Sequence, residues 1–361
     1  MLLNQAMSEV LHDLVIIGLG AVLTGLICQF SLPIGTALGL LDEPQVKRHS
    51  RHHQVTPLVG GIAVMLPLLI FNLVGSQLSL VNAWTGGWPV SGWLGAVVAA
   101  MLIMGSIDDR LHLSARLRLV LMALTFTLIA MFDPIVTIHH LQFPSLGFAM
   151  SLGSWAVLFT ALCLSALVNA INMADGRNGL VISLCLIWCI ALLTKTLNPR
   201  PIELWLVITS LCVAFVYNMR GRLFLGDGGT YSLAAFIGIS VVVSHNLSDL
   251  ALSAPQVACL FIIPVLDMLR LIGERLARGA SPMAPDHEHL HHYLDQFFGW
   301  KAGLPIYLAM VAVPIVIGFA GADLGFVGLM LGLLTYLTVW RVTRKRKTTF
   351  TGHQSAGSEA S

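Results

Sequence analysis

Long apolar segments separated by short polar stretches cover nearly the whole chain. Eleven segments are apolar enough to be candidate membrane helices, and they lie near 13–31, 59–77, 92–107, 117–132, 152–172, 178–194, 202–219, 230–245, 254–271, 303–319 and 323–341. Roughly 20 apolar residues cross about 30 Å of hydrocarbon, and several segments are shorter, so their ends are expected to move by a few residues. Hardly any segment carries the polar face of an outer helix in a soluble bundle. The pattern predicts an all-α, polytopic membrane bundle of about eleven transmembrane helices.

Composition agrees with a lipid surrounding. Of the 361 residues, 56% are hydrophobic and 11% are charged, and the mean hydropathy is +0.82. We therefore expect the lipid bilayer, and no nucleic acid, as the surrounding partner. The six cysteines all lie in apolar runs without ligand-like spacing, so we expect neither disulfides nor a cysteine metal site.

The basic residues orient the predicted helices. Eighteen of the twenty Lys and Arg residues fall in alternate loops and the C-terminal tail, and the other loops hold only Lys195 and Arg200. Basic loops favour the cytoplasmic side, so we expect a periplasmic N-terminus and a cytoplasmic C-terminus. No long linker is evident, which predicts one membrane domain over 1–347. The Ser, Thr and Gly content of 348–361 predicts a disordered cytoplasmic tail.

A pair of acids, Asp108-Asp109, follows the third predicted helix, and Arg110, Arg116 and Arg118 come after it. Adjacent carboxylates at a membrane boundary need a cation or a proton to offset desolvation and repulsion. The arginines alone would satisfy this as surface ion pairs. The alternative is a functional acidic site.

Amides and an acid occur together in the stretch NAINMADGRNGL. Asn169 and Asn172 share one face of a helix end, and Asp175 continues that face if the turn persists. Such groups suit hydrogen bonds to a base edge or oxygen ligation of a hard cation. Helix capping and interhelical hydrogen bonds are the structural alternative.

The stretch FLGDGGT places Asp227 among three glycines. With so little side-chain bulk, phosphate or metal is expected to fit against the backbone. A turn with an Asp N-cap is the alternative.

Two histidine-rich segments lie in loops on the same predicted side of the membrane as these acids. SPMAPDHEHLHH holds four histidines in six residues, for which zinc is one hypothesis and contact with pyrophosphate or sugar another; the carboxylates elsewhere favour a hard cation. Arg51 and His52 lie in a basic segment that serves either as an orientation signal or in substrate binding.

Together the clusters suit a magnesium-dependent enzyme that takes a phosphorylated donor and an acceptor held in lipid. A membrane transporter is the alternative from another class. A transporter places ionisable groups at mid-span in repeated halves. Nearly all of these groups lie instead at one predicted membrane boundary.

The order, spacing and sidedness of these motifs resemble the polyprenyl-phosphate N-acetylhexosamine-1-phosphate transferases. The resemblance runs from about Asp42 to the last helix and rests on RHHQVTPLVGG, DDR, NAINMADGRNGL, FLGDGG and SPMAPDHEHLHH. The histidine motif is similar to that of the GlcNAc-type branch. The resemblance implies transfer of GlcNAc-1-phosphate from UDP-GlcNAc to undecaprenyl phosphate with release of UMP, at the cytoplasmic face of a bacterial inner membrane. Such a product begins O-antigen, common-antigen or similar glycan assembly.

The resemblance also implies roles for single residues. Asp108 and Asp109 would take a proton from the polyprenyl phosphate or position it as the nucleophile. Asp227 with Asn172 would hold Mg²⁺, with Mn²⁺ as a substitute. The uridine site would be lined by Asn169, Asp175 and Asn178. The phosphates and the sugar would meet the basic and imidazole groups of Arg51, His52, Arg118, His289, His291 and His292.

Three positions depart from the family pattern. Asn178 stands where close relatives have an acid, His112 stands where relatives carry an acid after the Asp pair, and Thr230 replaces the usual Ser. These changes bear on the sugar more than on the reaction, so a FucNAc- or QuiNAc-type donor stays open. A homodimer also stays open.

Overall fold

The computed structural model describes residues 2–43, 55–77, 93–195, 201–246, 252–283 and 288–358. In these ranges the chain is mostly helical, with the helices α1 (Leu2–Gln29), α2 (Ser31–Leu38), α3 (Gly60–Gln77), α5 (Leu94–Leu111), α6 (Ala115–Phe132), α7 (Ala156–Ala174), α8 (Leu180–Leu193), α9 (Ile202–Met219), α10 (Gly226–Asn246), α11 (Ala254–Ala277), α12 (Leu290–Phe298), α13 (Trp300–Phe319) and α14 (Gly325–Ser358). Short 3₁₀ turns are η1 (Pro134–Val136), η2 (Pro144–Leu146), η3 (Gly153–Trp155) and η4 (Ala322–Leu324). In lipid, a helix satisfies its own backbone hydrogen bonds, which explains why apolar runs become helices here.

Strands are few and short in the described part. β1 (Leu41–Asp42) pairs antiparallel with β2 (Thr56–Pro57), and β3 (His140–Phe143) pairs with β4 (Phe148–Ser151). The β1–β2 pair continues in a backbone hydrogen bond from Leu58 N to Leu40 O (3.0 Å). This ladder joins the start of α3 to the segment that follows α2.

The chain divides into two compact units. Unit 1 comprises 1–141 and 150–252, and unit 2 comprises 142–149 and 253–361. The sequence predicts one membrane domain over 1–347, and this stretch contains unit 1 and all of unit 2 except residues 348–361.

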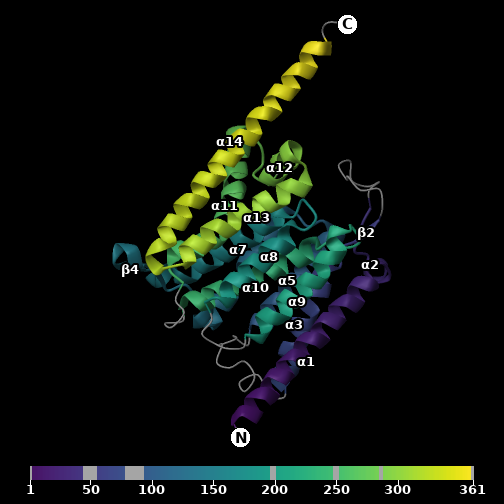
Figure 1. Ribbon diagram of the computed structural model, residues 1–361, viewed down its shortest axis with the longest axis vertical. Helices are drawn as coiled ribbons and strands as arrows, with labels where there is room; N and C mark the ends of the chain where they lie inside the picture. The colour runs from purple at the N-terminus through teal and green to yellow at the C-terminus, as the bar shows by residue number, and fades with distance from the viewer. Residues whose placement is uncertain are drawn as a thin grey trace. The chain divides into compact units, whose positions relative to one another are not determined.

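Helix α10 is the central element of unit 1. Residues of α3, α5, α7 and α8 pack around it (Figure 1), and almost every described side chain on it is buried. Close approach depends on small residues: a Cβ at Gly238 would lie 2.7 Å from the Leu164 side chain of α7. Small residues at helix interfaces are typical of membrane bundles, in which packing rather than apolar burial drives association.

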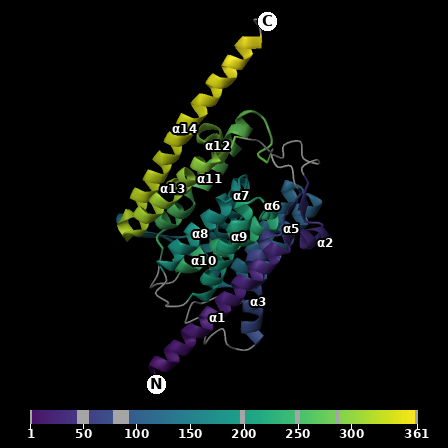
Figure 2. The same cartoon turned by 45° about the vertical axis from the view of Figure 1, so that its right-hand side comes forward.

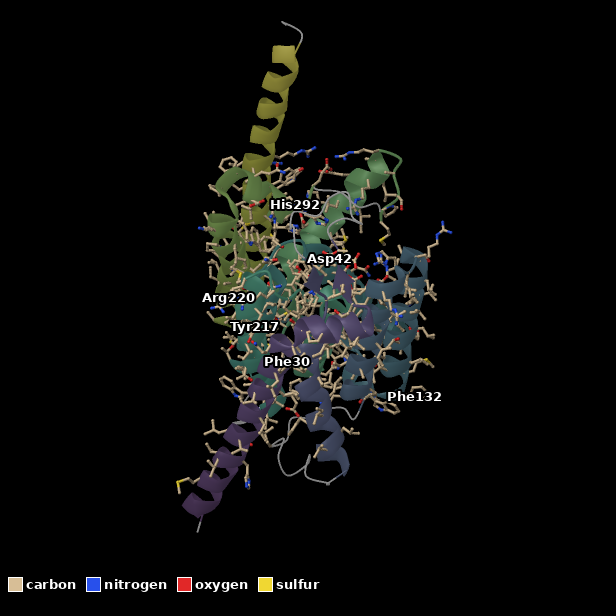
Figure 3. All side chains as sticks on the ribbon, turned by 90° about the vertical axis from the view of Figure 1, so that its right-hand side faces the viewer. Phe30, Asp42, Phe132, Tyr217, Arg220 and His292 are labelled. Carbon is tan, nitrogen blue, oxygen red and sulfur yellow. The ribbon has the colours of Figure 1, made fainter. Side chains whose placement is uncertain are left out.

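Helix α1 forms an edge of unit 1 (Figure 2) and packs on α3 and α9. Its outward side chains are apolar and open, with Leu14, Leu19 and Val22 each 60% or more exposed, as expected for a lipid-facing surface. On its inner face the Thr24 hydroxyl donates to Ser210 Oγ of α9 (2.9 Å). At its end the Tyr217 hydroxyl donates to Gln29 Oε1 (3.3 Å), and Tyr217 lies near Phe30 (Figure 3).

Unit 2 is built from α11, α13 and α14, with α12 packed on α13 and α14. A glycine again allows close packing of two helices, here α13 and α14. A Cβ at Gly328 of α14 would lie 2.5 Å from the Pro314 carbonyl oxygen of α13. Helix α14 reaches beyond the other elements of this unit (Figure 2). It continues to Ser358 and so includes much of the stretch 348–361, whose composition predicts disorder.

The all-helical membrane prediction is confirmed. Among the described residues, eight helices are long and apolar enough to cross a membrane, and two shorter apolar helices lie at Gly60–Val74 and Leu180–Leu193. Helix α5, which carries three charged residues in its last turn, occupies the remaining predicted segment. A helix covers each of the eleven segments, whereas their number as membrane spans and their orientation stay predictions. The chain is a multi-pass membrane protein.

Candidate active site

The predicted acids and amides of unit 1 meet where α5, α7 and α9 end and where α6, α8 and α10 begin. Successive antiparallel helices bring these ends to one side of the unit. Asp108, Asp109, Arg118, Asn172 and Asp227 form one connected group there. We refer to these five residues as the acidic cluster.

Asp108 is fully engaged by protein groups. Its carboxylate is buried, and Oδ1 accepts a hydrogen bond from the Leu113 amide (2.8 Å). Oδ2 accepts one from Arg118 Nη1 (2.9 Å) and one from the Tyr231 hydroxyl (2.7 Å). Asp108 therefore holds Arg118 in place, and Arg118 also lies 3.9 Å from Asp227 Oδ2.

Asp109 points to a different partner, the first turn of α10. Its Oδ1 accepts from the Asp227 amide (2.9 Å) and its Oδ2 from the Gly228 amide (3.1 Å). The first amides of a helix have no acceptor within the helix, and a carboxylate satisfies them and interacts favourably with the helix dipole. Asp109 thus caps α10 from another helix. The expectation that Asp227 itself forms the N-cap is wrong.

The glycines of FLGDGGT allow helices to touch. Gly226 has φ of +70°, and a Cβ there would lie 2.5 Å from Asp109 Oδ2. A Cβ at Gly228 would lie 2.7 Å from Ser106 Oγ, and one at Gly229 would lie 3.0 Å from Gly61. The space beside these glycines is therefore occupied by α3 and α5. Neighbouring helices fill the space beside the glycines, so a ligand at this motif would meet the Asp227 side chain and not the glycine backbone. Binding of phosphate or metal at this motif stays a prediction.

Gly60 and Gly61 have the matching role on α3. Their amides donate to the carbonyl oxygens of Phe224 (2.9 Å) and Leu225 (3.0 Å). A side chain on either glycine would overlap the backbone of the 224–229 segment. Gly60 and Gly61 thus pack backbone against backbone on the segment that carries Asp227.

Asp227 is the open carboxylate of the acidic cluster. Its Oδ1 accepts from the Asn172 amide nitrogen (2.6 Å), which also donates to Thr230 Oγ1 (3.1 Å). The Asp227 side chain is 30% exposed, whereas that of Asp108 is 2% exposed. Its Oδ2 lies 3.9 Å from Nη1 of Arg118. Asp227 is therefore the acid best able to take an outside ligand.

The three residues predicted to line a uridine site lie on both sides of the end of α7. Asn169 donates to Ser165 O (2.8 Å) one turn before Asn172. Helix α7 ends at Ala174, so the turn does not persist and Asp175 does not continue the helical face. Asn178 follows in the loop, with its amide nitrogen 3.8 Å from where a Cβ on Gly221 would lie.

The pKa of Asp175 depends on the acidic cluster. Asp175 is exposed as a residue, but protein atoms surround its carboxyl group. This burial, followed by the negative charge of Asp227, raises the pKa of Asp175 to about 7.

Two residues of this region are missed by sequence reasoning. Tyr231 joins Asp108 and Arg118 through its hydroxyl (2.7 and 3.3 Å). Asn218 accepts from the Gly179 amide (2.6 Å) and donates to Leu223 O (2.9 Å), so it links the NAINMADGRNGL loop to the turn before α10. In the sequence, each of these residues is only a polar group near the end of an apolar run. That position does not indicate which distant residue the group contacts.

The histidine motif belongs to unit 2. His289, His291 and His292 stand at the start of α12, with ring centroids 5.3 Å apart for His289 and His291 and 4.2 Å apart for His291 and His292. Their partner His287, and the predicted site residues Arg51 and His52, lie outside the described residues.

The oxygen donors of the acidic cluster bear on the predicted Mg²⁺ site. Within the described ranges, no three His, Cys, Asp or Glu side chains are arranged to hold a metal ion, the three histidines included. Mg²⁺ usually takes one or two protein oxygens and completes its shell with water and substrate phosphates. The partly exposed Asp227 carboxylate and the Asn172 amide fit that smaller demand. In addition, the acidic cluster contains three carboxyl groups and one arginine, so its acids outnumber its cation.

Comparison with known proteins agrees with the motifs. The model of glycosyl transferase family 4 matches residues 92–245. The chain is 27% identical, over 85% of its length and 81% of the relative, to an undecaprenyl-phosphate α-N-acetylglucosaminyl 1-phosphate transferase of Yersinia pestis. It is 26% identical to the Escherichia coli K12 protein of the same name, over 88% of this chain and 83% of the relative. It is also 26% identical to a decaprenyl-phosphate N-acetylglucosaminephosphotransferase of Mycolicibacterium smegmatis, over 79% of this chain and 76% of the relative.

These matches confirm the family resemblance seen in the motifs. The family match contains the whole acidic cluster, together with Asn169, Asp175 and Asn178. The histidine motif lies beyond it and is covered by the longer alignments with whole relatives.

Proposed function

We propose that this relative of glycosyl transferase family 4 transfers an N-acetylhexosamine-1-phosphate, with GlcNAc as the expected sugar, from its UDP-sugar to undecaprenyl phosphate. A phosphate oxygen of the acceptor forms a bond to the β-phosphorus of the donor. The bond between that phosphorus and the bridging oxygen breaks, and UMP leaves. The relatives named for this reaction align over most of the chain, which supports the proposal.

The observation that carries the proposal is the asymmetry of the acidic cluster. Asp108 and Asp109 use both of their oxygens on protein donors, whereas the Asp227 carboxylate is partly exposed beside Arg118. A partly exposed acid, an amide and one arginine at a membrane boundary suit a phosphorylated donor and a lipid phosphate.

Asp227 and Asn172 would hold Mg²⁺. When bound there, the ion would offset negative charge on the pyrophosphate of the donor. Arg118 would contact phosphate oxygens directly, since it is the cation of the acidic cluster.

Of the two roles considered for the Asp pair, the contacts favour positioning over proton removal. Asp108 orients Arg118, and Asp109 holds the first turn of α10 and therefore Asp227. Hydrogen bonds accepted by a carboxylate stabilise its ionised form, so these contacts oppose its taking a proton.

The same reasoning extends to the rest of the site. Asn169, Asp175 and Asn178 would line the uridine pocket, and the histidine motif with Arg51 and His52 would meet the sugar and phosphates. The charge asymmetry of the loops supports a bacterial inner-membrane location with the site facing the cytoplasm.

The test is an assay of purified protein with undecaprenyl phosphate and a panel of UDP-N-acetylhexosamines, with and without Mg²⁺ or Mn²⁺. We expect UMP release together with lipid-linked product, greatest with UDP-GlcNAc, and loss of both in EDTA. Asp227→Asn should lower the rate about 100-fold or more, because a neutral amide holds a hard dication less well. Asp323→Asn is the control, since Asp323 is an exposed acid outside the acidic cluster.

The outcomes separate the parts of the proposal. Absence of UMP release with every donor would contradict the transferase function. Full activity in EDTA would contradict the metal while leaving the transfer intact. Preference for another UDP-sugar would correct the sugar alone.

A further inference from the structure

Unit 2 contains a buried carboxylate, Asp267 of α11, that is the centre of a polar network. Its Oδ1 accepts from Arg270 Nη2 (2.9 Å) and from the Tyr336 hydroxyl (3.0 Å). Its Oδ2 accepts from His289 Nδ1 (3.2 Å), and both oxygens lie within 3.2 Å of the Leu290 amide. Asp267 is 5% exposed.

The network joins three helices. Tyr336 belongs to α14, and His289 with Leu290 forms the start of α12. Arg270 extends the network by donating to the Glu288 carbonyl (2.5 Å), directly before the histidines. Asp267 therefore holds the backbone and one ring of the histidine motif at the same time.

A buried charge of this kind is costly in a membrane protein, and apolar residues of similar volume would pack as well or better. Arg270 offsets the charge of Asp267, but a simple ion pair needs no histidine and no helix N-terminus. The further contacts to His289 and Leu290 are what a positioning role requires.

We propose that Asp267 is a positioning residue for the transfer reaction, acting through His289. The inference rests on the proposed function, in which the histidine motif meets the donor. A carboxylate at Nδ1 makes that nitrogen the donor, so Nε2 is the ring nitrogen presented to other groups. The same arrangement orients histidines that act as metal ligands or catalytic bases.

The position of α12 depends on the same carboxylate. The Leu290 amide is one of the first of α12 and receives no side-chain cap from His289 itself. Because Asp267 accepts from that amide, it sets where α12 begins, and His291 and His292 follow one and two residues later. Asp267 thus aligns the three rings as a group.

The test compares Asp267→Asn, His289→Ala and the double variant by UMP release. The effect of Asp267→Asn should be a loss of about 10- to 100-fold in kcat/KM, the scale seen when an outer partner of an oriented histidine is removed. If Asp267 acts through His289 and the two rings that follow it, the loss in the double variant should be smaller than the product of the two single losses. Losses that multiply would overturn the proposal.

Asp323→Asn is the control. Asp323 is an exposed acid of unit 2 in η4 (Ala322–Leu324), outside the Asp267 network described above. Its effect, whatever its size, should multiply with that of His289→Ala. Chromatography in detergent checks that each variant remains folded.

A second readout does not depend on activity. Nitrogen-15 spectra of histidine-labelled protein report which ring nitrogen carries the proton. In the unaltered protein His289 should be protonated at Nδ1, and in Asp267→Asn the Nδ1 signal should shift. Identical His289 signals in the two proteins would overturn the positioning role. Failure of UMP release in the unaltered protein would instead contradict the proposed function, and the spectra would still decide the role of Asp267.

Discussion

At the scale of single residues, two adjacent aspartates have different tasks. Asp108 engages Arg118 and Tyr231, and Asp109 engages the first amides of α10. Neighbouring residues on a helix lie about 100° apart around its axis, so their side chains reach different partners. A shared motif therefore does not imply a shared role.

Asp109→Asn is predicted to destabilise the protein more than it alters donor chemistry directly. An amide offers one acceptor and one donor group, so either the Asp227 or the Gly228 amide would lose its partner. A buried donor left unsatisfied costs about 1–3 kcal/mol, and thermal unfolding in detergent should show a lower Tm. Arg110→Gln is the control, because Arg110 is the next residue and is exposed. An unchanged Tm for Asp109→Asn would refute the capping role.

At the scale of helices, the site depends on how closely α5 and α10 approach. A Cβ on Gly105 would overlap the backbone of Asp227 and Gly228, so this contact requires a residue without a side chain. The helices on which the acids stand are thus held at backbone distance, and the position of Asp227 depends on that contact.

Gly105→Ala is predicted to push α5 and α10 apart, at a cost of about 1–3 kcal/mol in stability, and to reduce UMP release. Gly95→Ala is the control on the same helix, because its Cβ would meet the Asn72 side chain at an ordinary 3.4 Å. Thermal unfolding and initial rates for the two variants are the measurements. Equal behaviour of the two variants would show that close approach at Gly105 is unimportant.

At the scale of the whole molecule, the open question is the direction of the helices in the membrane. Eighteen of twenty basic residues fall in loops of one predicted side, and that side carries the acidic cluster. The positive-inside rule predicts that this side is cytoplasmic.

A cysteine replacing Arg116 is therefore predicted to be shielded from an impermeant thiol reagent added to intact cells, and one replacing Thr85 should be labelled. The unaltered protein is the baseline, since its own cysteines lie in apolar segments. Labelling of both positions after cell lysis shows that each thiol is reactive. External labelling at 116 would reverse the orientation and move the proposed site to the other face.

The amino-acid sequence alone determined the membrane class, the place of the eleven long apolar helices and the residues of the acidic cluster, but not the short helices α2 and α12. These properties are local: helix α9 occupies Ile202–Met219 as its apolar run predicts, because lipid leaves a long apolar segment little choice but to form a helix. The spacing of Asn169 and Asn172 likewise decides that they share a face.

Only the tertiary structure decided which acid is open and what each glycine touches. Asp109 meets the amide of a residue 118 positions away, and Asp108 meets the hydroxyl of one 123 positions away. The motif glycines, which suggest room for a ligand, in fact face α3 and α5. Hydrophobic pattern and spacing constrain one helix at a time, whereas the partner of a buried polar group is chosen by how distant helices pack.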